Sequence, residues 1–191
     1  MINYETDRLV LRNYHRNDAN DLYDFLSTDF VAQYQNYGPF SMGCCIKRIE
    51  NCLNDDRRWV VVLKENNKVI GCLEYSEGEY GSFNIGYELS EEYGKKGYAT
   101  EACKVLVKHV FTVANARRIC ADMSEENTGS WKLAERLGFR REGHFIEDDV
   151  LYRKNADEDP VYLNSYYYAI LRREWKCGEK LEKLKRKNTT L

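Results

Sequence analysis

The stretch YELSEEYGKKGYATEACKVLVKHVF, residues 87–111, joins a predicted strand to a predicted helix across two glycines and two lysines. The strand, residues 83–89, is rich in β-forming side chains. The helix, residues 100–115, repeats apolar side chains at the i, i+3, i+4, i+7 spacing. Because little more than residues 94–97 separates the two, we expect the helix to begin almost directly at the tip of the strand.

Such a join is suited to binding an anion. A helix that starts at a strand tip points its unpaired first-turn N–H groups and its positive dipole end at the space beyond the strand. Gly97 leaves that space free of a side chain and allows a tight turn, while Lys95 and Lys96 add positive charge. The join therefore predicts a phosphate or pyrophosphate site, with a tight turn carrying two solvated lysines as the alternative. Its spacing fits neither the P-loop nor the dinucleotide-binding G-x-G-x-x-G pattern.

The chain before the join is β-rich. Three short runs separated by turns indicate an antiparallel meander: residues 59–63, 69–75 and 83–89. Further upstream, residues 8–14 alternate as a strand. Two helices follow that strand, and we expect Asp18 to cap the first and Ser41 to cap the second.

The chain after the join completes the domain. A buried strand at residues 117–123 is followed by a helix that Asn127 opens, and then by strands at 139–146 and 164–175 with a polar excursion between them at 147–159. This order predicts a single mixed α/β domain with a central mixed and mostly antiparallel sheet of about seven strands, flanked by about four helices. The helix after the join should be a right-handed crossover between two parallel strands.

The composition indicates one soluble globular domain. Of the 191 residues, 43% are hydrophobic and 31% are charged, with no secretory signal and no apolar run near the roughly 20 residues that span a bilayer. We place the domain at residues 1–175 and a basic tail at 176–191, and expect no membrane association. The net charge of −2 argues against nucleic-acid binding, although the tail could contact RNA or a ribosome surface.

The cysteines and histidines form no recognisable ligand set. The seven cysteines show no C-x-x-C spacing, and the three histidines are far apart in the sequence. We interpret the cysteines as free thiols in a reducing cytoplasm, with disulfides or a metal site as the alternative. No motif predicts a bound metal.

Two longer stretches, GYELSEEYGKKGYATEA at residues 86–102 and ENTGSWKLAERLGFRREG at residues 126–143, resemble the motifs of the GCN5-related N-acetyltransferase (GNAT) superfamily. ETDRLVLRNY at residues 5–14 and YYYAILRREW at residues 166–175 are similar to the branch that contains the ribosomal-protein N-terminal alanine and serine acetyltransferases. The four motifs have the order and spacing of that branch, so the resemblance covers nearly the whole chain.

The resemblance implies that backbone amides of the join bind the pyrophosphate of coenzyme A. Gly97 and Ala99 occupy the last two positions of the family's loop pattern, Gln/Arg-x-x-Gly-x-Gly/Ala, whereas Gly94 stands where Gln or Arg is usual. It also implies a splayed pair of parallel strands that holds the pantetheine arm of the cofactor. The implied cofactor-binding residues are Tyr87, Leu89, Lys95, Lys96, Gly97, Tyr98, Ala99, Thr100, Asn127 and Ser130.

The resemblance further implies direct transfer of an acetyl group from acetyl-CoA to a primary amine, such as a protein N-terminus or a small-molecule amine, without a metal. Many relatives carry a tyrosine acid where this chain has Ala134, so Ser130 becomes the candidate proton donor. Glu88 and Asp149 are the candidate bases. The alternatives are that Glu88 points to solvent and that Asp149 belongs to a solvated loop.

The acceptor is expected to bind between residues 30–55 and 147–163, where two acidic regions, 55–56 and 147–149, would suit a cationic amine. Four aromatic residues could wall its cleft or could simply pack on the sheet: Tyr34, Tyr37, Phe40 and Trp59. Protein N-termini, amino acids, polyamines and aminoglycosides are all candidate acceptors, and both a monomer and a homodimer fit. Alternative functions are a catalytically idle acyl-CoA-binding sensor, and an acyltransferase that uses another acyl-CoA or an O-acceptor.

Overall fold

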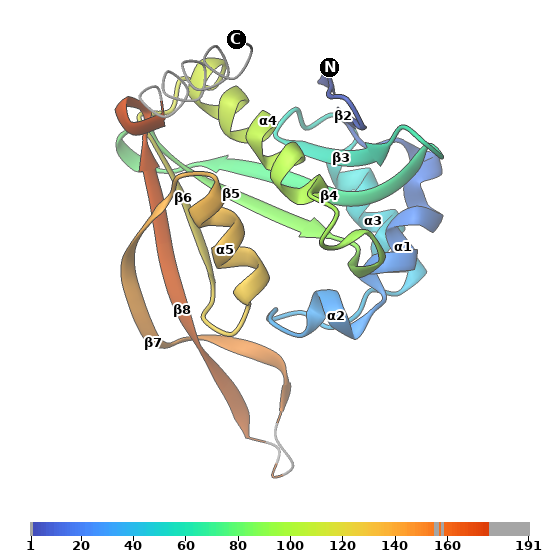
Figure 1. Cartoon of the computed structure of the whole chain (residues 1–191). Helices are drawn as coiled ribbons and strands as arrows, with labels where there is room; N and C mark the ends of the chain where they lie inside the picture. The colour runs from blue at the N-terminus through green and yellow to red at the C-terminus, as the bar shows by residue number, and fades with distance from the viewer. Residues whose placement is uncertain (1, 155–156, 158, 176–191) are drawn as a thin grey trace.

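The computed structural model describes residues 2–154, 157 and 159–175. Within these residues one eight-stranded sheet runs through the molecule, and helices pack on both of its faces (Figure 1). The strands are β1 (Asn3–Glu5), β2 (Leu9–Arg12), β3 (Arg58–Leu63), β4 (Lys68–Glu77), β5 (Ser82–Leu89), β6 (Arg118–Ser124), β7 (Arg140–Lys154) and β8 (Pro160–Leu171). The α-helices are α1 (Ala19–Leu26), α2 (Asp29–Ala32), α3 (Met42–Cys52), α4 (Tyr98–Thr112) and α5 (Thr128–Arg136). The basic tail predicted at 176–191 lies outside the described residues.

The sheet has the order β1-β2-β3-β4-β5-β6-β8-β7, and its neighbouring strands are antiparallel except for β5 and β6. Helix α4 connects these two parallel strands as a crossover. The mixed, mostly antiparallel fold with a crossover helix is therefore confirmed. The sheet has eight strands rather than about seven because β1, which the sequence pattern does not show, pairs with β2 at the edge.

Strands β5 and β6 separate soon after they pair. Their parallel register runs only from Ser82 opposite Arg118 to Asn84 opposite Cys120. On its other edge β5 stays paired with β4 as far as Leu89. Residues 85–89 of β5 therefore present backbone N–H and C=O groups on one side to a gap rather than to a described strand.

Two local predictions are wrong. The segment 147–159 is not a simple excursion, because β7 continues through it to Lys154 and pairs with β8, with register shifts after Arg141, Phe145 and Val150. Polar residues are tolerated here since β7 is an edge strand. Asp18 does occupy the N-cap position of α1, but its side chain makes no capping hydrogen bond, because its carboxylate accepts hydrogen bonds from the Arg12 guanidinium at 2.7 and 2.8 Å.

Two apolar clusters hold the layers together. On one face of the sheet α4 and α5 pack over the central strands around Trp59, Leu106 and Phe111, and on the other face α1 and α3 pack over β3 and β4. The prediction for Ser41 is correct, since its hydroxyl accepts a hydrogen bond from the Cys44 N–H at the start of α3. The six described cysteines are free thiols, of which only Cys44 is exposed. In the described part of the chain, no helix is both long and apolar enough to cross a membrane.

A buried histidine links α4 to the sheet. His109 Nδ1 lies 2.8 Å from the Tyr4 hydroxyl and Nε2 lies 3.1 Å from the Tyr75 hydroxyl, with the Trp59 ring against its edge. Burial lowers the pKa of His109, and the more distant charge of Asp56 only partly opposes this effect. The imidazole therefore stays neutral in the folded protein over a pH range in which it is protonated in the unfolded chain.

We predict that this histidine makes the fold less stable in mild acid. Because the folded state binds the proton more weakly, stability is complete above the unfolded pKa of about 6.5 and falls as the pH drops below it. His109→Gln keeps a donor and an acceptor but cannot titrate. Thermal unfolding followed by circular dichroism at about pH 7.5 and about pH 5.5 should show a smaller loss of Tm in the variant than in the wild type. Equal losses in both proteins would contradict the assignment.

Candidate active site

The join between β5 and α4 has the geometry of an anion-binding loop. Gly97 is the N-cap residue of α4, with the left-handed φ of 84° that favours glycine, and Lys95 also has a positive φ, 58°. The first hydrogen bond of α4 runs from the Glu101 N–H to the Gly97 carbonyl. The N–H groups before Glu101 consequently have no acceptor within the helix and point outward from its N-terminus.

The turn between β1 and β2 supports this loop. The Arg8 guanidinium donates to the Lys96 carbonyl at 2.9 Å, pairs with the Glu101 carboxylate at 2.6 Å and lies over the Tyr98 ring. Burial raises the pKa of Glu101, but hydrogen bonds from Thr6 and Arg8 outweigh this effect and lower it overall. Arg8 thus offsets the one acidic side chain in the first turn of α4, which would otherwise repel an anion.

A cavity of about 1230 Å³ extends from this loop along β5 to the first turn of α5, and we call it the loop cavity. Of the predicted cofactor-binding residues, Tyr87, Leu89, Lys95, Gly97, Tyr98, Ala99, Thr100, Asn127 and Ser130 line it. Lys96 does not line it, and its ammonium group lies 5.3 Å from the centre of the Tyr93 ring. The structure therefore brings nine of the ten predicted residues to one cavity.

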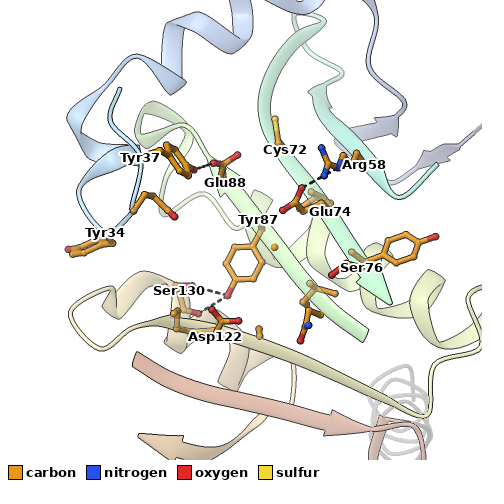
Figure 2. A pocket seen from close by; sticks show the side chains of 18 of the residues that line it. Tyr34, Tyr37, Arg58, Cys72, Glu74, Ser76, Tyr87, Glu88, Asp122 and Ser130 are labelled. Carbon is orange, nitrogen blue, oxygen red and sulfur yellow. Dashed lines mark hydrogen bonds and ion pairs between the residues drawn. The ribbon is translucent and has the colours of Figure 1, made fainter. Parts of the chain in front are cut away.

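A second cavity, of about 780 Å³, lies over the β4, β5 and β6 strands beneath α3, and we call it the trough (Figure 2). The two cavities share lining residues at the place where β5 and β6 separate: Tyr34, Gln35, Tyr87, Glu88, Asn127 and Ser130. Two of the predicted catalytic residues, Ser130 and Glu88, are among these shared residues, and Asp149 lines the trough alone. A molecule in one cavity can thus reach a molecule in the other at this junction.

Tyr87 and Ser130 form a hydrogen-bonded pair at the junction. The Ser130 hydroxyl donates to the Tyr87 hydroxyl at 2.9 Å, and the Tyr87 hydroxyl donates to the Ser130 carbonyl at 3.1 Å. Asn127 caps α5 by accepting the Ser130 N–H at 3.1 Å, which fixes the turn that carries the serine. Burial raises the pKa of Tyr87 well above its ordinary value, so its hydroxyl keeps its proton.

Glu88 points into the cavities and both of its oxygens have partners. One carboxylate oxygen accepts from the Arg48 guanidinium at 2.5 Å, and the other accepts from the Tyr37 hydroxyl (Figure 2). Burial, followed by the Glu88 charge, raises the pKa of Tyr37, so the phenol remains a donor. The Glu88 carboxylate is thus held rigidly at the end of β5.

The walls of the trough only partly match the sequence prediction. Tyr34, Tyr37 and Phe40 line it. Trp59 does not, because its side chain is fully buried on the α4 side of the sheet, where its Nε1 donates to the Asp56 carbonyl. The acidic pair at residues 55–56 lines neither cavity, since Asp55 pairs with nearby arginines.

The sequence reasoning missed five charged residues of the trough: Lys47, Arg48, Arg58, Glu74 and Asp122. A signal for Arg48 was present in the helical spacing of α3, whose trough-lining face repeats at i, i+3, i+4 and i+7: Cys44, Lys47, Arg48 and Asn51. A signal for Asp122 was its charge within an otherwise apolar strand, ICADM. At the edge of the trough the Tyr152 N–H of β7 donates to the Gln35 carbonyl at 3.1 Å, joining the hairpin to the segment after α2.

Comparison with known proteins supports this picture. A family model described as an acetyltransferase (GNAT) domain matches residues 8–140. The chain is 32% identical over 178 residues to the uncharacterized N-acetyltransferase p20 of Bacillus licheniformis, which covers 89% of this chain and 96% of the relative. It is also similar to the solved structure of a GNAT-family acetyltransferase from Bacillus anthracis, with a TM-score of 0.79 and 27% identity over 91% of this chain and 100% of the other.

More distant structures share the fold. Spermidine N-acetyltransferase from Vibrio cholerae, solved in complex with CoA and spermine, has a TM-score of 0.74 and 22% identity over 89% of this chain and 99% of the other. The ribosomal-protein-S5-alanine acetyltransferase from Vibrio fischeri has a TM-score of 0.76 and 20% identity over 92% of this chain and 99% of the other. At these identities the likeness concerns the fold.

The Arg48–Glu88 pair generates a stability prediction. The two side chains are only 19% and 12% exposed, so removing one partner leaves a poorly solvated charge. Arg48→Met should lower the free energy of unfolding by about 3 kcal/mol, and Arg48→Met combined with Glu88→Gln should recover much of that loss because no lone charge remains. Urea denaturation of both variants measures the difference. A loss below about 0.5 kcal/mol in Arg48→Met would show that the pair behaves as an ordinary surface ion pair.

Proposed function

The chain belongs to the GNAT acetyltransferase family, and from that premise we propose that it transfers the acetyl group of acetyl-CoA directly to a primary amine. The observation that carries the proposal is the meeting of two cavities at the end of β5. One of them begins at an anion-binding helix N-terminus, and the other opens over the polar face of the sheet. A donor and an acceptor could bind from opposite sides and meet at Tyr87, Glu88 and Ser130.

The residues of the loop cavity fit coenzyme A. The free N–H groups of α4 and the ammonium group of Lys95 would hold its pyrophosphate, and Gly97 leaves room for the phosphates to approach the backbone. The free edge of β5 would pair with the amide groups of the pantetheine arm. When bound, acetyl-CoA would supply an acyl carbon activated as a thioester. Backbone N–H groups at the junction would stabilise the negative charge that develops on the acyl oxygen.

In this proposal the Tyr87–Ser130 pair supplies the proton that the departing thiolate takes up. Ala134, where many relatives have a tyrosine acid, is buried in the core and offers no proton. The Ser130 hydroxyl, with the Tyr87 hydroxyl beside it, is the donor nearest the junction that the side chains of α5 offer. We therefore assign Ser130 as the proton donor and Tyr87 as the residue that positions it.

The acceptor is a primary amine whose class stays open among protein N-termini, amino acids, polyamines and aminoglycosides. Glu88 and Asp149 both line the trough and are retained as candidate bases. Because Arg48 and Tyr37 already occupy both Glu88 oxygens, Glu88 also fits a role in shaping the junction. The free thiols of the described cysteines fit a reducing compartment such as the cytoplasm.

The proposal predicts thiol release from acetyl-CoA when the wild-type protein receives a suitable amine. The panel would contain short peptides with free N-termini, free amino acids, spermidine and kanamycin, and free thiol would be measured by a colorimetric reagent. Gly97→Val is the matched control, because a branched side chain at φ 84° is strained and would stand where the phosphates approach. Calorimetry should show that this variant no longer binds coenzyme A. Coenzyme A binding by the wild type without turnover of any amine would instead favour a sensor or another acyl donor.

We further predict that Ser130→Ala lowers kcat by on the order of 100-fold while coenzyme A affinity changes by less than about twofold. Ser130→Thr keeps the hydroxyl and should retain most of the activity. Tyr87→Phe should give a smaller loss in kcat, because it removes the partner of the serine hydroxyl but not the hydroxyl itself. Steady-state kinetics combined with calorimetry separates the two effects. Wild-type turnover in Ser130→Ala would show that Ser130 is not the proton donor and only forms part of the first turn of α5.

A further inference from the structure

Four carboxylates line the trough, and within the described residues only one of them has no protein partner. Glu88 is held by Arg48 and Tyr37, and Glu74 is paired with Arg58 at 3.7 Å. Asp149 accepts a hydrogen bond from the N–H of the next residue at 2.8 Å. The carboxylate of Asp122 has neither a hydrogen bond nor an ion pair among the residues that the structure describes, and its side chain is exposed to the trough.

Asp122 sits directly across the gap between the separating strands. The last parallel pair of β5 and β6 is Asn84 opposite Cys120. Continuing that register by two residues places Asp122 level with Gly86, and both residues line the trough. Because residues level with each other on neighbouring strands point to the same face of a sheet, the carboxylate lies on the same face as Gly86, which has no side chain. Figure 2 shows Asp122 entering the trough on the side of Ser130, and Glu88 and Glu74 on the other side.

The space over Gly86 is the approach to the junction. A Cβ built on Gly86 would meet the Glu74 side chain at 3.1 Å, so even one methyl group would narrow the floor of the trough. Gly86 directly precedes Tyr87 and lies two residues before Glu88, both of which belong to the junction. A group held between Gly86 and Asp122 would therefore lie beside the place where the two cavities meet.

We propose that Asp122 binds the ammonium group of the acceptor and takes a proton from it, which frees the nitrogen lone pair to attack the thioester. This inference rests on the proposed function and assigns it a catalytic residue. The acceptor loses two protons when an alkylammonium ion becomes an amide. The C–N bond forms as the C–S bond breaks, one proton ends on the sulfur of coenzyme A, and the other passes to Asp122 and then to water.

The arginines of the trough do not neutralise Asp122. The charged side chains that line it with Asp122 come from α3, β3, β4, β5 and β7, and they are Lys47, Arg48, Arg58, Glu74, Glu88 and Asp149. Its register partner on β8 is Tyr167, whose pKa is raised by its hydrogen bond to Cys120 and by burial, so that it stays neutral. Arg48 and Arg58 are held by Glu88 and Glu74, and Lys47 belongs to α3, which covers β3 and β4. The negative charge on the β6 side is therefore not compensated by an arginine.

The test compares Asp122→Asn with the wild type on whichever panel amine the wild type acetylates. We expect kcat/KM for the amine to fall about 100-fold near neutral pH, with coenzyme A affinity unchanged within about twofold by calorimetry. The deficit should shrink as the pH approaches the pKa of the amine, because an uncharged amine gains little from a negative partner. Glu77→Gln, an exposed carboxylate of β4 outside both cavities, is the matched control and should behave as the wild type.

The outcomes separate this inference from the proposed function. Wild-type turnover together with an unchanged Asp122→Asn profile overturns the inference and leaves the proposed function standing. The same pH-dependent deficit in Asp149→Asn or Glu88→Gln, but not in Asp122→Asn, assigns the role elsewhere and also overturns it. Failure of the wild type to acetylate any amine removes both, and that result is read from the wild type alone. Because Asp122 is exposed and partnerless, the Tm of Asp122→Asn should equal that of the wild type.

Discussion

The separation of β5 from β6 is the constraint on which the rest of the site depends. A strand inside a sheet normally has its backbone groups paired on both edges, and β5 has this only as far as Asn84. Its ladder with β4 continues to Leu89, so the strand stays paired on that side while its other edge is left open. The open edge lies where the loop cavity and the trough come together. The meeting of the two cavities is in this sense a consequence of a missing strand contact.

Charge is distributed differently on the two sides of that gap. On the side of the loop cavity, Arg8 forms an ion pair with Glu101. The N-terminus of α4 therefore keeps a positive electrostatic potential, which favours an anion. On the side of the trough, Arg48 and Arg58 form ion pairs with carboxylates of β5 and β4. The charge that remains on the β6 wall is the negative charge of Asp122. Under the proposed function, this distribution would direct a polyanionic donor and a cationic acceptor to different cavities.

The sequence was informative where function resides in contiguous residues. The loop around Gly97 and the helix start at Asn127 are each a few residues long, and their chemistry follows from local backbone geometry alone. Residues brought together from afar were not predictable in this way. Arg48 and Glu88 are 40 residues apart, and their contact depends on how α3 is rotated over the sheet. Trp59 was misplaced because β3 is buried on both faces, so the strand shows no alternation that would indicate which face the indole takes. Asp122 can be identified as a lining residue of the trough only from the structure, because its exposure depends on the early end of the pairing between β5 and β6.

Residues 2–8 do more than form an edge strand. Ile2 is tied to Asn13 through its N–H, Tyr4 reaches His109 in α4, and Thr6 and Arg8 both hold Glu101 at the start of the same helix. Helix α4 is therefore braced near both of its ends by the amino-terminal segment. A truncation or a bulky insertion inside this segment would displace the start of α4, which lines the loop cavity, before it disturbed the packing of the core. Tags and linkers should therefore leave residues 2–8 intact.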